Sequence, residues 1–81
     1  MEGTKMREFH IVLRSLQQVQ AFVDLAMMQP FDVYVGNDRQ NINGKDLMGM
    51  FGLDLSEPVS VRMRCSLEEY DSFSAAACAI A

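Results

Sequence analysis

Apolar and polar residues alternate in three stretches of the chain, residues 7–13, 31–35 and 58–64. An alternation with a period of two is typical of a β-strand that has one buried and one exposed face. The apolar members, which we expect to face the core, are Phe9, Ile11 and Leu13, then Phe31, Val33 and Val35, and finally Val59, Val61 and Met63. The outward positions of the last stretch include Arg62 and Arg64, so this strand is expected to have a basic outer face.

A further strand is predicted directly after the second stretch. Gly36-Asn37-Asp38 has the residue types of a tight hairpin turn. We therefore expect the chain to turn back there and to form a strand from Arg39 to Ile42.

Two other stretches repeat apolar residues every three or four positions, which is the period of an amphipathic helix. The first consists of Leu16, Val19, Phe22 or Val23, and Ala26 or Met27, ending before Pro30, and the second of Leu67, Tyr70, Phe73 or Ser74, Ala77, and Ile80 or Ala81. A capping box precedes each one, Ser15 with Gln18 and Ser66 with Glu69. In such a box the serine hydroxyl accepts from a free N–H of the first turn while the longer side chain reaches back.

Residues 43–53 combine several large apolar side chains with three glycines, Gly44, Gly49 and Gly52. Glycine costs about 1 kcal/mol relative to alanine inside a helix, so intrinsic propensity does not favour the short helix expected here. Its apolar side chains either close over an edge of the core or form a docking surface. The two interpretations differ at Met48 and Phe51, because neighbouring apolar residues compete with them for the inward face.

Together these elements give the order β-α-β-β-α-β-α and an α+β fold. We expect one domain over residues 1–81, an open-faced β-sandwich with a four-stranded antiparallel sheet and helices on one face. The short helix is expected at an edge of the sheet.

Composition narrows the class of protein. The chain has 81 residues, 49% of them hydrophobic and 22% charged, which suits one small globular domain and leaves no room for a second domain or the deep substrate cleft of an elaborate enzyme. No apolar run approaches the roughly 18 residues of a membrane span, and the first residues lack the apolar region of a secretory signal, so we expect a cytoplasmic protein. A net charge of −4 disfavours nucleic acid and points to protein partners.

The residues that bind metals or carry out covalent chemistry are few. Cys65 and Cys78 lack metal-ligand spacing and are interpreted as small buried apolar side chains. His10 is placed by the alternation on the outward side of the first strand. We therefore predict no metal site and no cofactor.

The chain resembles HPr, the phosphocarrier family of the bacterial sugar phosphotransferase system. The resemblance rests on the order of elements and on three motifs: Ala21-Phe22-Val23, Gly36-Asn37-Asp38 and Gly44-Lys45-Asp46-Leu47-Met48-Gly49-Met50. From residue 29 onward the chain follows the family pattern without a gap. The resemblance implies the HPr-like fold and protein partners in sugar transport or carbon-catabolite control.

The chain departs from that family at the phosphorylated histidine. Counting back from Phe22 places Ser15 at this position, with Gln17 in place of the arginine that helps to hold the phosphoryl group. A serine hydroxyl needs an adjacent base, whereas an imidazole is a good nucleophile near pH 7. We expect Ser15 to be an N-cap, with weak anion binding at the helix start and phosphorylation of Ser15 as the other interpretations.

Asp46 stands at the position of the family's regulatory serine. A carboxylate at a helix start is favoured by capping and by the helix dipole, which is sufficient to explain this residue. The alternative is that Asp46 partly imitates a phosphoserine, with one charge in place of nearly two.

The family's docking surface is the part that the resemblance carries over. The matching positions are Leu16, Gln17, Gln20, Asp24, Leu47, Met48, Phe51 and Gly52. Methionine suits an adaptable protein-binding surface. Asp24 is acidic where the family often has a lysine, which weakens attraction to acidic partners.

Three hypotheses of function follow. The first is an HPr-like regulator or decoy that has lost both phosphorylation sites and acts by binding, as a monomer or weak homodimer rather than as an enzyme. The second is a working phosphocarrier that uses a residue other than histidine. The third is a small ferredoxin-like ligand-binding domain, against which the extra short helix argues.

Overall fold

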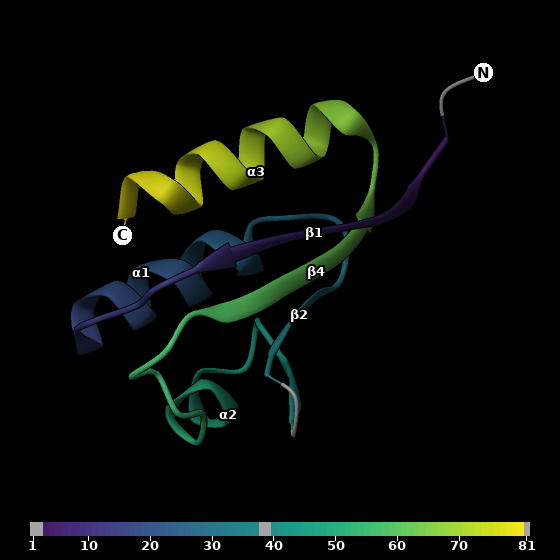
Figure 1. The fold of residues 1–81 in the computed structure, drawn as a ribbon. Coiled ribbons are helices and arrows are strands. Elements are labelled where there is room, and N and C mark those ends of the chain that lie inside the picture. The colour runs from purple at the N-terminus through teal and green to yellow at the C-terminus, as the bar shows by residue number, and fades with distance from the viewer. Residues whose placement is uncertain (1–2, 38–39, 81) are drawn as a thin grey trace.

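The computed structural model describes residues 3–37 and 40–80, which form one sheet covered by helices (Figure 1). The elements are β1 (Lys5–Ile11), α1 (Leu16–Met27), β2 (Val33–Gly36), β3 (Asn41–Asn43), α2 (Leu47–Phe51), β4 (Val59–Cys65) and α3 (Leu67–Ile80). The strand order is β1-β4-β2-β3, and each neighbouring pair is antiparallel. The predicted α+β class and the order βαββαβα are therefore confirmed.

The two faces of the sheet differ as the alternation predicts. β4 lies in the middle, with Val61 opposite Phe9 of β1 on one side and opposite Val35 of β2 on the other. Val35 and Val61 are completely buried, whereas Arg62 and Arg64 of β4 are exposed. The basic outer face of this strand is thus confirmed.

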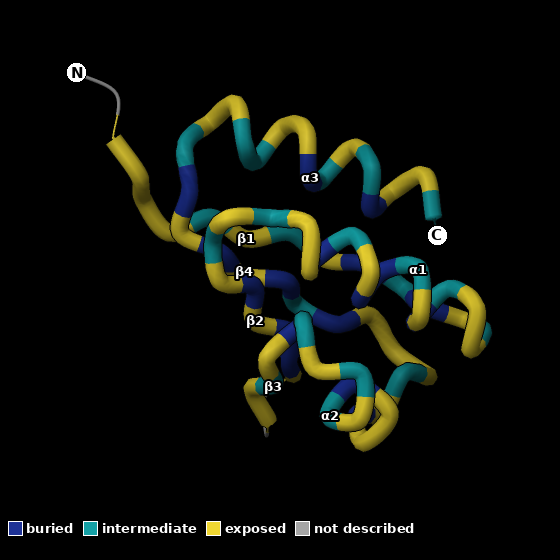
Figure 2. Tube along the Cα trace, turned by 180° about the vertical axis from the view of Figure 1, so that it is seen from behind, coloured by how far each residue is buried: buried dark blue, intermediate teal, exposed yellow. Residues whose placement is uncertain are grey.

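The helices cover the apolar face of the sheet, and α3 is held there by an aromatic cluster. The ring of Phe73 lies 5.8 Å from that of Phe9, 6.0 Å from that of Phe22 and 5.8 Å from that of Phe31. Phe73 therefore connects α3 to β1, to α1 and to the loop before β2. Figure 2 shows the buried residues gathered between the sheet and the helices. α2 is smaller and lies at the β3 edge, where it contacts α1 and β3.

The predicted capping box of α3 forms with both of its bonds, and that of α1 forms with its reciprocal bond shifted by one residue. Ser15 Oγ accepts from the Gln18 N–H at 3.1 Å, and Ser66 Oγ accepts from the Glu69 N–H at 3.2 Å. Glu69 Oε1 in turn accepts from the Ser66 N–H at 2.9 Å. Gln18 Oε1 reaches one residue further back and accepts from the Arg14 N–H at 2.6 Å. These local contacts fix where α1 and α3 begin.

Several boundaries differ from the prediction. β1 begins and ends two residues earlier than expected, yet Leu13 is still buried beyond the end of the strand. β3 begins at Asn41; Asp38 and Arg39, which were predicted in the turn and the strand, and Ala81 lie outside the described residues. Leu67 was placed on the apolar stripe of α3, but at the first position of this helix it is 51% exposed.

The helices of the described residues are short. None of those in residues 3–37 and 40–80 combines the length and the apolar character needed to cross a bilayer.

Candidate functional site

The candidate site is the surface shared by α1 and the segment of residues 45–58, which we call the docking surface. The segment runs alongside α1 in the opposite direction. At one end the Lys45 ammonium donates to the Gln29 carbonyl just past α1, at 3.0 Å. At the other end Leu55 and Pro58 line a hollow together with Leu16 at the start of α1.

Helix geometry indicates which side of α1 faces this segment. Phe22 packs against α3 through Phe73, so the flank of α1 that carries Phe22 is turned to α3. In a helix with 3.6 residues per turn, Leu16, Gln20 and Met27 lie on the opposite flank. All three are exposed. Because α1 also contacts α2, this flank is the one that lies toward α2.

The exposed apolar side chains concentrate at this surface. Among the described residues eight large apolar side chains are exposed, and five of them belong to α1, to its C-cap Met28 or to α2: Leu16, Met27, Met28, Met48 and Phe51. Met48 is 78% exposed and Phe51 46%, whereas Met50 is completely buried and Leu47 packs against the core. The outward interpretation of Met48 and Phe51 is therefore correct, and Leu47, expected on the docking surface, lies mostly inward.

The polar members of the predicted set are also accessible. Gln17, Gln20, Asp24 and Gly52 are exposed. Gln20 Nε2 donates to Asp24 Oδ1 at 3.0 Å, one turn further along α1. This contact holds the Asp24 carboxylate against the helix surface, where it stays open to solvent.

Gly49 explains how a glycine-rich segment forms a helix here. A Cβ on this residue would lie 2.7 Å from Ile42 Cγ2 of β3 and 3.0 Å from Asp46 Oδ2. A Cβ here would force the Ile42 side chain to shift, so glycine lets α2 approach β3 this closely without such a change. The glycine that weakens the helix by propensity thus permits the packing that stabilises it.

Ser15 occupies the N-cap of α1. Its backbone is extended, and its hydroxyl is engaged by the Gln18 N–H, as a plain cap requires. The residues that line the hollow beside it are Val12, Leu13, Arg14, Ser15, Leu16, Val19, Leu55, Ser56 and Pro58. None of these has an imidazole or carboxylate side chain that would act as a base toward the Ser15 hydroxyl.

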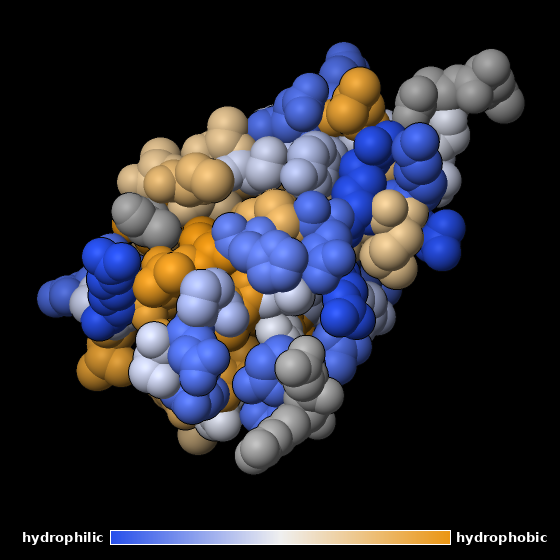
Figure 3. All heavy atoms as spheres, viewed as in Figure 1, coloured by the Kyte–Doolittle hydropathy of each residue, from blue (hydrophilic) through white to orange (hydrophobic). Residues whose placement is uncertain are grey.

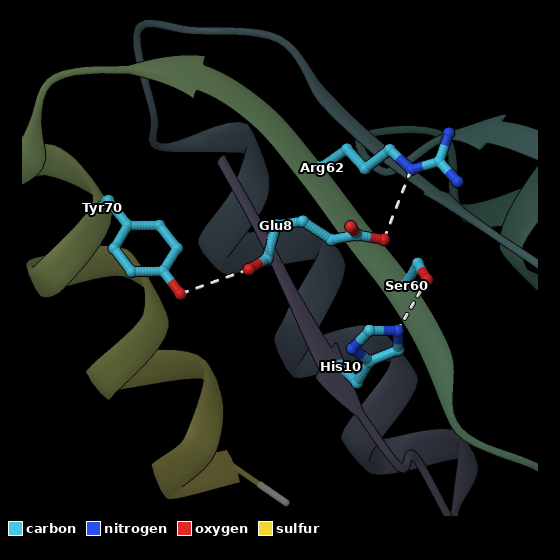
Figure 4. A network of polar contacts seen from close by, with 5 residues as sticks. All are labelled: Glu8, His10, Ser60, Arg62 and Tyr70. Carbon is cyan, nitrogen blue, oxygen red and sulfur yellow. Dashed lines mark hydrogen bonds and ion pairs between the residues drawn. The ribbon is translucent and has the colours of Figure 1, made fainter. Parts of the chain in front are cut away.

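His10 lies elsewhere, on the open face of the sheet (Figure 4). Its Nε2 shares a hydrogen bond of 3.0 Å with the Ser60 hydroxyl of β4. Next to this pair, Glu8 and Arg62 form an exposed ion pair with 3.5 Å between Oε2 and Nε. The imidazole is therefore a part of the polar sheet surface and does not line the hollow at the start of α1.

Asp46 is the N-cap residue of α2, as predicted by position. Its side chain makes no capping hydrogen bond, and Oδ2 lies 3.0 Å from the place that a Cβ on Gly49 would take. The expected side-chain cap is thus absent, and the exposed carboxylate acts on the helix only through its charge.

The hollow at the start of α1 was not predicted from the sequence. It is open to solvent, has a volume of about 820 Å³ and is lined mostly by apolar side chains. Leu55 and Pro58 contribute to it from the loop after α2, where only long-range packing brings them to Ser15. Figure 3 shows apolar side chains gathered at the end of the sheet where β1 leads into α1, while hydrophilic side chains cover the middle of the sheet.

The cysteines divide into one buried and one exposed side chain. Cys65 on β4 is completely buried, and burial raises its pKa above the ordinary value of 9.0. Cys78 on α3 is exposed, so its predicted burial is wrong. In the described part of the chain no three His, Cys, Asp or Glu side chains cluster as metal ligands do.

Comparison with known proteins does not assign the chain to a family. No family model matches the chain, and no curated protein matches it.

Proposed function

We propose that this protein is an HPr-like module that acts by binding other proteins and does not carry phosphate on a histidine. Its partners are proteins of the sugar phosphotransferase system or of carbon-catabolite control, and it binds them in the cytoplasm. It acts as a monomer or weak homodimer, without enzymatic activity and without binding nucleic acid. The observation that carries the proposal is the exposure of Leu16, Met48 and Phe51 on one surface, 71%, 78% and 46% respectively.

The chemistry at the start of α1 supports binding over phosphate transfer. The Ser15 hydroxyl accepts the Gln18 N–H, and the residues that line the adjacent hollow offer no general base. Gln17 has no charge with which to hold a phosphoryl group, in contrast to an arginine at this position. A phosphoserine formed there would also be a stable ester, unsuited to onward transfer.

The arrangement of elements also supports this proposal over a ferredoxin-like domain. A ferredoxin-like unit follows the order β-α-β-β-α-β. Here α2, the helix between β3 and β4, has five residues, and a helix of 14 residues follows β4.

The test is incubation with enzyme I of the phosphotransferase system and labelled phosphoenolpyruvate, followed by mass spectrometry. We expect no phosphoryl label, together with binding of enzyme I or another phosphotransferase protein. Phe51→Ala should weaken that binding about tenfold, as expected for the loss of an exposed aromatic anchor. A stoichiometric, transferable label on the unmodified chain would overturn the proposal and support a phosphocarrier that uses another residue.

A gain-of-function variant is the matched control. Ser15→His combined with Gln17→Arg introduces the nucleophile and the cation that the resemblance assigns to these positions. If this variant takes up label and the unmodified chain does not, then docking is intact and only the chemistry is missing. If the chain binds no phosphotransferase protein at all, the proposed partners are wrong.

A further inference from the structure

Four acidic side chains belong to the elements that form the docking surface. Asp24 on α1, Asp46 at the start of α2, and Asp54 and Glu57 in the loop after α2 are all exposed. The Asp54 carboxylate accepts two hydrogen bonds from Ser56, 3.0 Å from its N–H and 2.6 Å from its hydroxyl, which favour the ionised form.

Two cations lie at the ends of the same surface. The Lys45 ammonium is directed at the carbonyl of Gln29 past the C-terminal end of α1, where it offsets the negative end of the helix dipole. Arg14 is exposed beside the hollow at the other end of α1. Between these ends, Asp24 on α1 and Asp46 at the start of α2 contribute two further exposed carboxylates.

The other four lysines and arginines of the described residues lie elsewhere. Lys5 and Arg7 belong to β1, and Arg62 and Arg64 belong to β4. The acidic side chains therefore lie mainly on the helices and the loop after α2, with Asp24, Asp46, Asp54 and Glu57 at the docking surface and Glu68, Glu69 and Asp71 on α3, whereas β1 and β4 are more basic. Such a separation selects the charge of a partner and its orientation of approach.

We propose that the docking surface binds a basic amphipathic helix of a partner protein, with apolar side chains packed on Leu16, Met48 and Phe51 and with lysines or arginines next to the surrounding carboxylates. This inference rests on the proposed function and names the chemistry of its partner. A helix suits the surface because its apolar stripe would pack both on the hollow at the start of α1 and on the exposed apolar side chains of α2. Methionines let such a surface adapt to the partner's side chains.

The experiment compares two synthetic 18-residue helical peptides that have the same leucine positions and differ only in polar residues, lysine in one and glutamate in the other. Binding to the full chain is measured by calorimetry and by amide chemical shifts at low and at moderate salt. We expect the lysine peptide to bind at least tenfold more tightly than the glutamate peptide, with a preference that falls as salt screens the charges. The shift changes should fall on α1 and residues 45–58.

Two variants and one control locate the interaction. Asp24→Lys should weaken binding of the lysine peptide about threefold to tenfold, and Phe51→Ala should weaken binding of either peptide. Asp71→Lys makes the same charge change at an exposed position on α3 and should have little effect. Thermal unfolding of each variant shows whether it is folded.

The outcomes separate this inference from the proposed function. Equal binding of the two peptides, a preference for the glutamate peptide, no binding of either, or equal effects of Asp24→Lys and Asp71→Lys would overturn the basic partner. If Asp24→Lys strengthens binding of enzyme I, the docking function stands and the partner's charge is the opposite of the one inferred. If the lysine peptide binds as expected while no phosphotransferase protein does, this inference stands and the proposed partners fall.

Discussion

The Tyr70 hydroxyl on α3 donates a hydrogen bond of 3.3 Å to the backbone carbonyl of Glu8 on β1 (Figure 4). β1 is an edge strand of the sheet and pairs with β4 on its inner side. In an antiparallel strand each residue directs its N–H and its carbonyl to the same side. Because the Glu8 carbonyl is directed to Tyr70 and away from β4, both backbone groups of Glu8 face the open edge. Tyr70 thus occupies a backbone acceptor that would otherwise be available for pairing with another strand.

Removing this hydroxyl should destabilise the protein slightly. Tyr70→Phe keeps the edge-on contact with the Phe9 ring, whose centroid lies 6.1 Å away, and deletes only the hydrogen bond. We expect a loss of about 0.5 to 1 kcal/mol in the free energy of unfolding, measured in urea. Tyr34→Phe on the open face of the sheet is the matched control and should change stability less. Equal effects would show that the bond to Glu8 contributes nothing.

The Ser15 cap should be replaceable by another capping residue. Ser15→Ala leaves the Gln18 N–H without its acceptor, so the free energy of unfolding should fall by about 1 kcal/mol. Ser15→Asp supplies a new acceptor and should retain most of the stability. A chain that tolerates alanine as well as aspartate would argue against capping as the role of this residue.

Gly49 should resist the substitution that usually stabilises a helix. Gly49→Ala places a methyl group 2.7 Å from Ile42 Cγ2, and we expect a loss of about 1 to 3 kcal/mol instead of a gain. Gly52→Ala is the comparison, because its Cβ would meet only the Gly49 carbonyl at 3.3 Å.

A double-mutant cycle with Ile42→Ala tests the cause of this loss. Removing the Ile42 side chain clears the space, so Gly49→Ala should cost less in that background. If Gly49→Ala lowers the free energy of unfolding equally in both backgrounds, the strain arises at a contact other than Ile42.

The two cysteines should react at different rates. Cys78 is exposed and should react with a thiol reagent in the native protein, whereas Cys65 is buried, has a raised pKa and should react only after unfolding. Counting modified thiols with and without denaturant measures this difference. Cys78→Ser should abolish the native reaction, and a native reaction that survives this change would show that β4 opens readily.

Asp54 should titrate below its ordinary pKa of 3.8, because the Ser56 hydroxyl and N–H donate to its carboxylate. A depressed pKa in the folded state means that this carboxylate stabilises the loop above the ordinary pKa and that the contribution is lost as the pH falls through the folded value. A carboxyl NMR titration should show the low midpoint. Ser56→Ala should move it up, since it removes the hydroxyl donor; an unchanged midpoint would exclude that bond as the cause.

Local signals explain why much of the fold was predictable. The Ser15–Gln18 and Ser66–Glu69 pairs lie within single helical turns, so their spacing in the sequence already specifies the contact. The alternation in β4 is equally local. Cys78, in contrast, follows a run of alanines that are small on every side of α3, and the pattern therefore did not indicate which face is inward.

The candidate site depended on tertiary packing and was only partly predictable. Whether Met48 or Met50 points inward is determined by how α2 rotates against α1 and β3, and Gly49 is the residue that sets this approach. The hollow beside Ser15 requires Leu55 and Pro58 to return from a distant loop. Neither relationship leaves a periodic signal in the sequence.

The aromatic contacts of Phe73 have a consequence for motion. Because this ring packs against β1, α1 and the loop before β2, α1 and α3 cannot leave the sheet without breaking the core that they share. α2 contributes a single completely buried side chain, Met50, and opens at a smaller free-energy cost. The docking surface therefore joins a rigid half on α1 to a pliant half on α2, and a partner that binds both halves would stabilise the fold at its weakest helix.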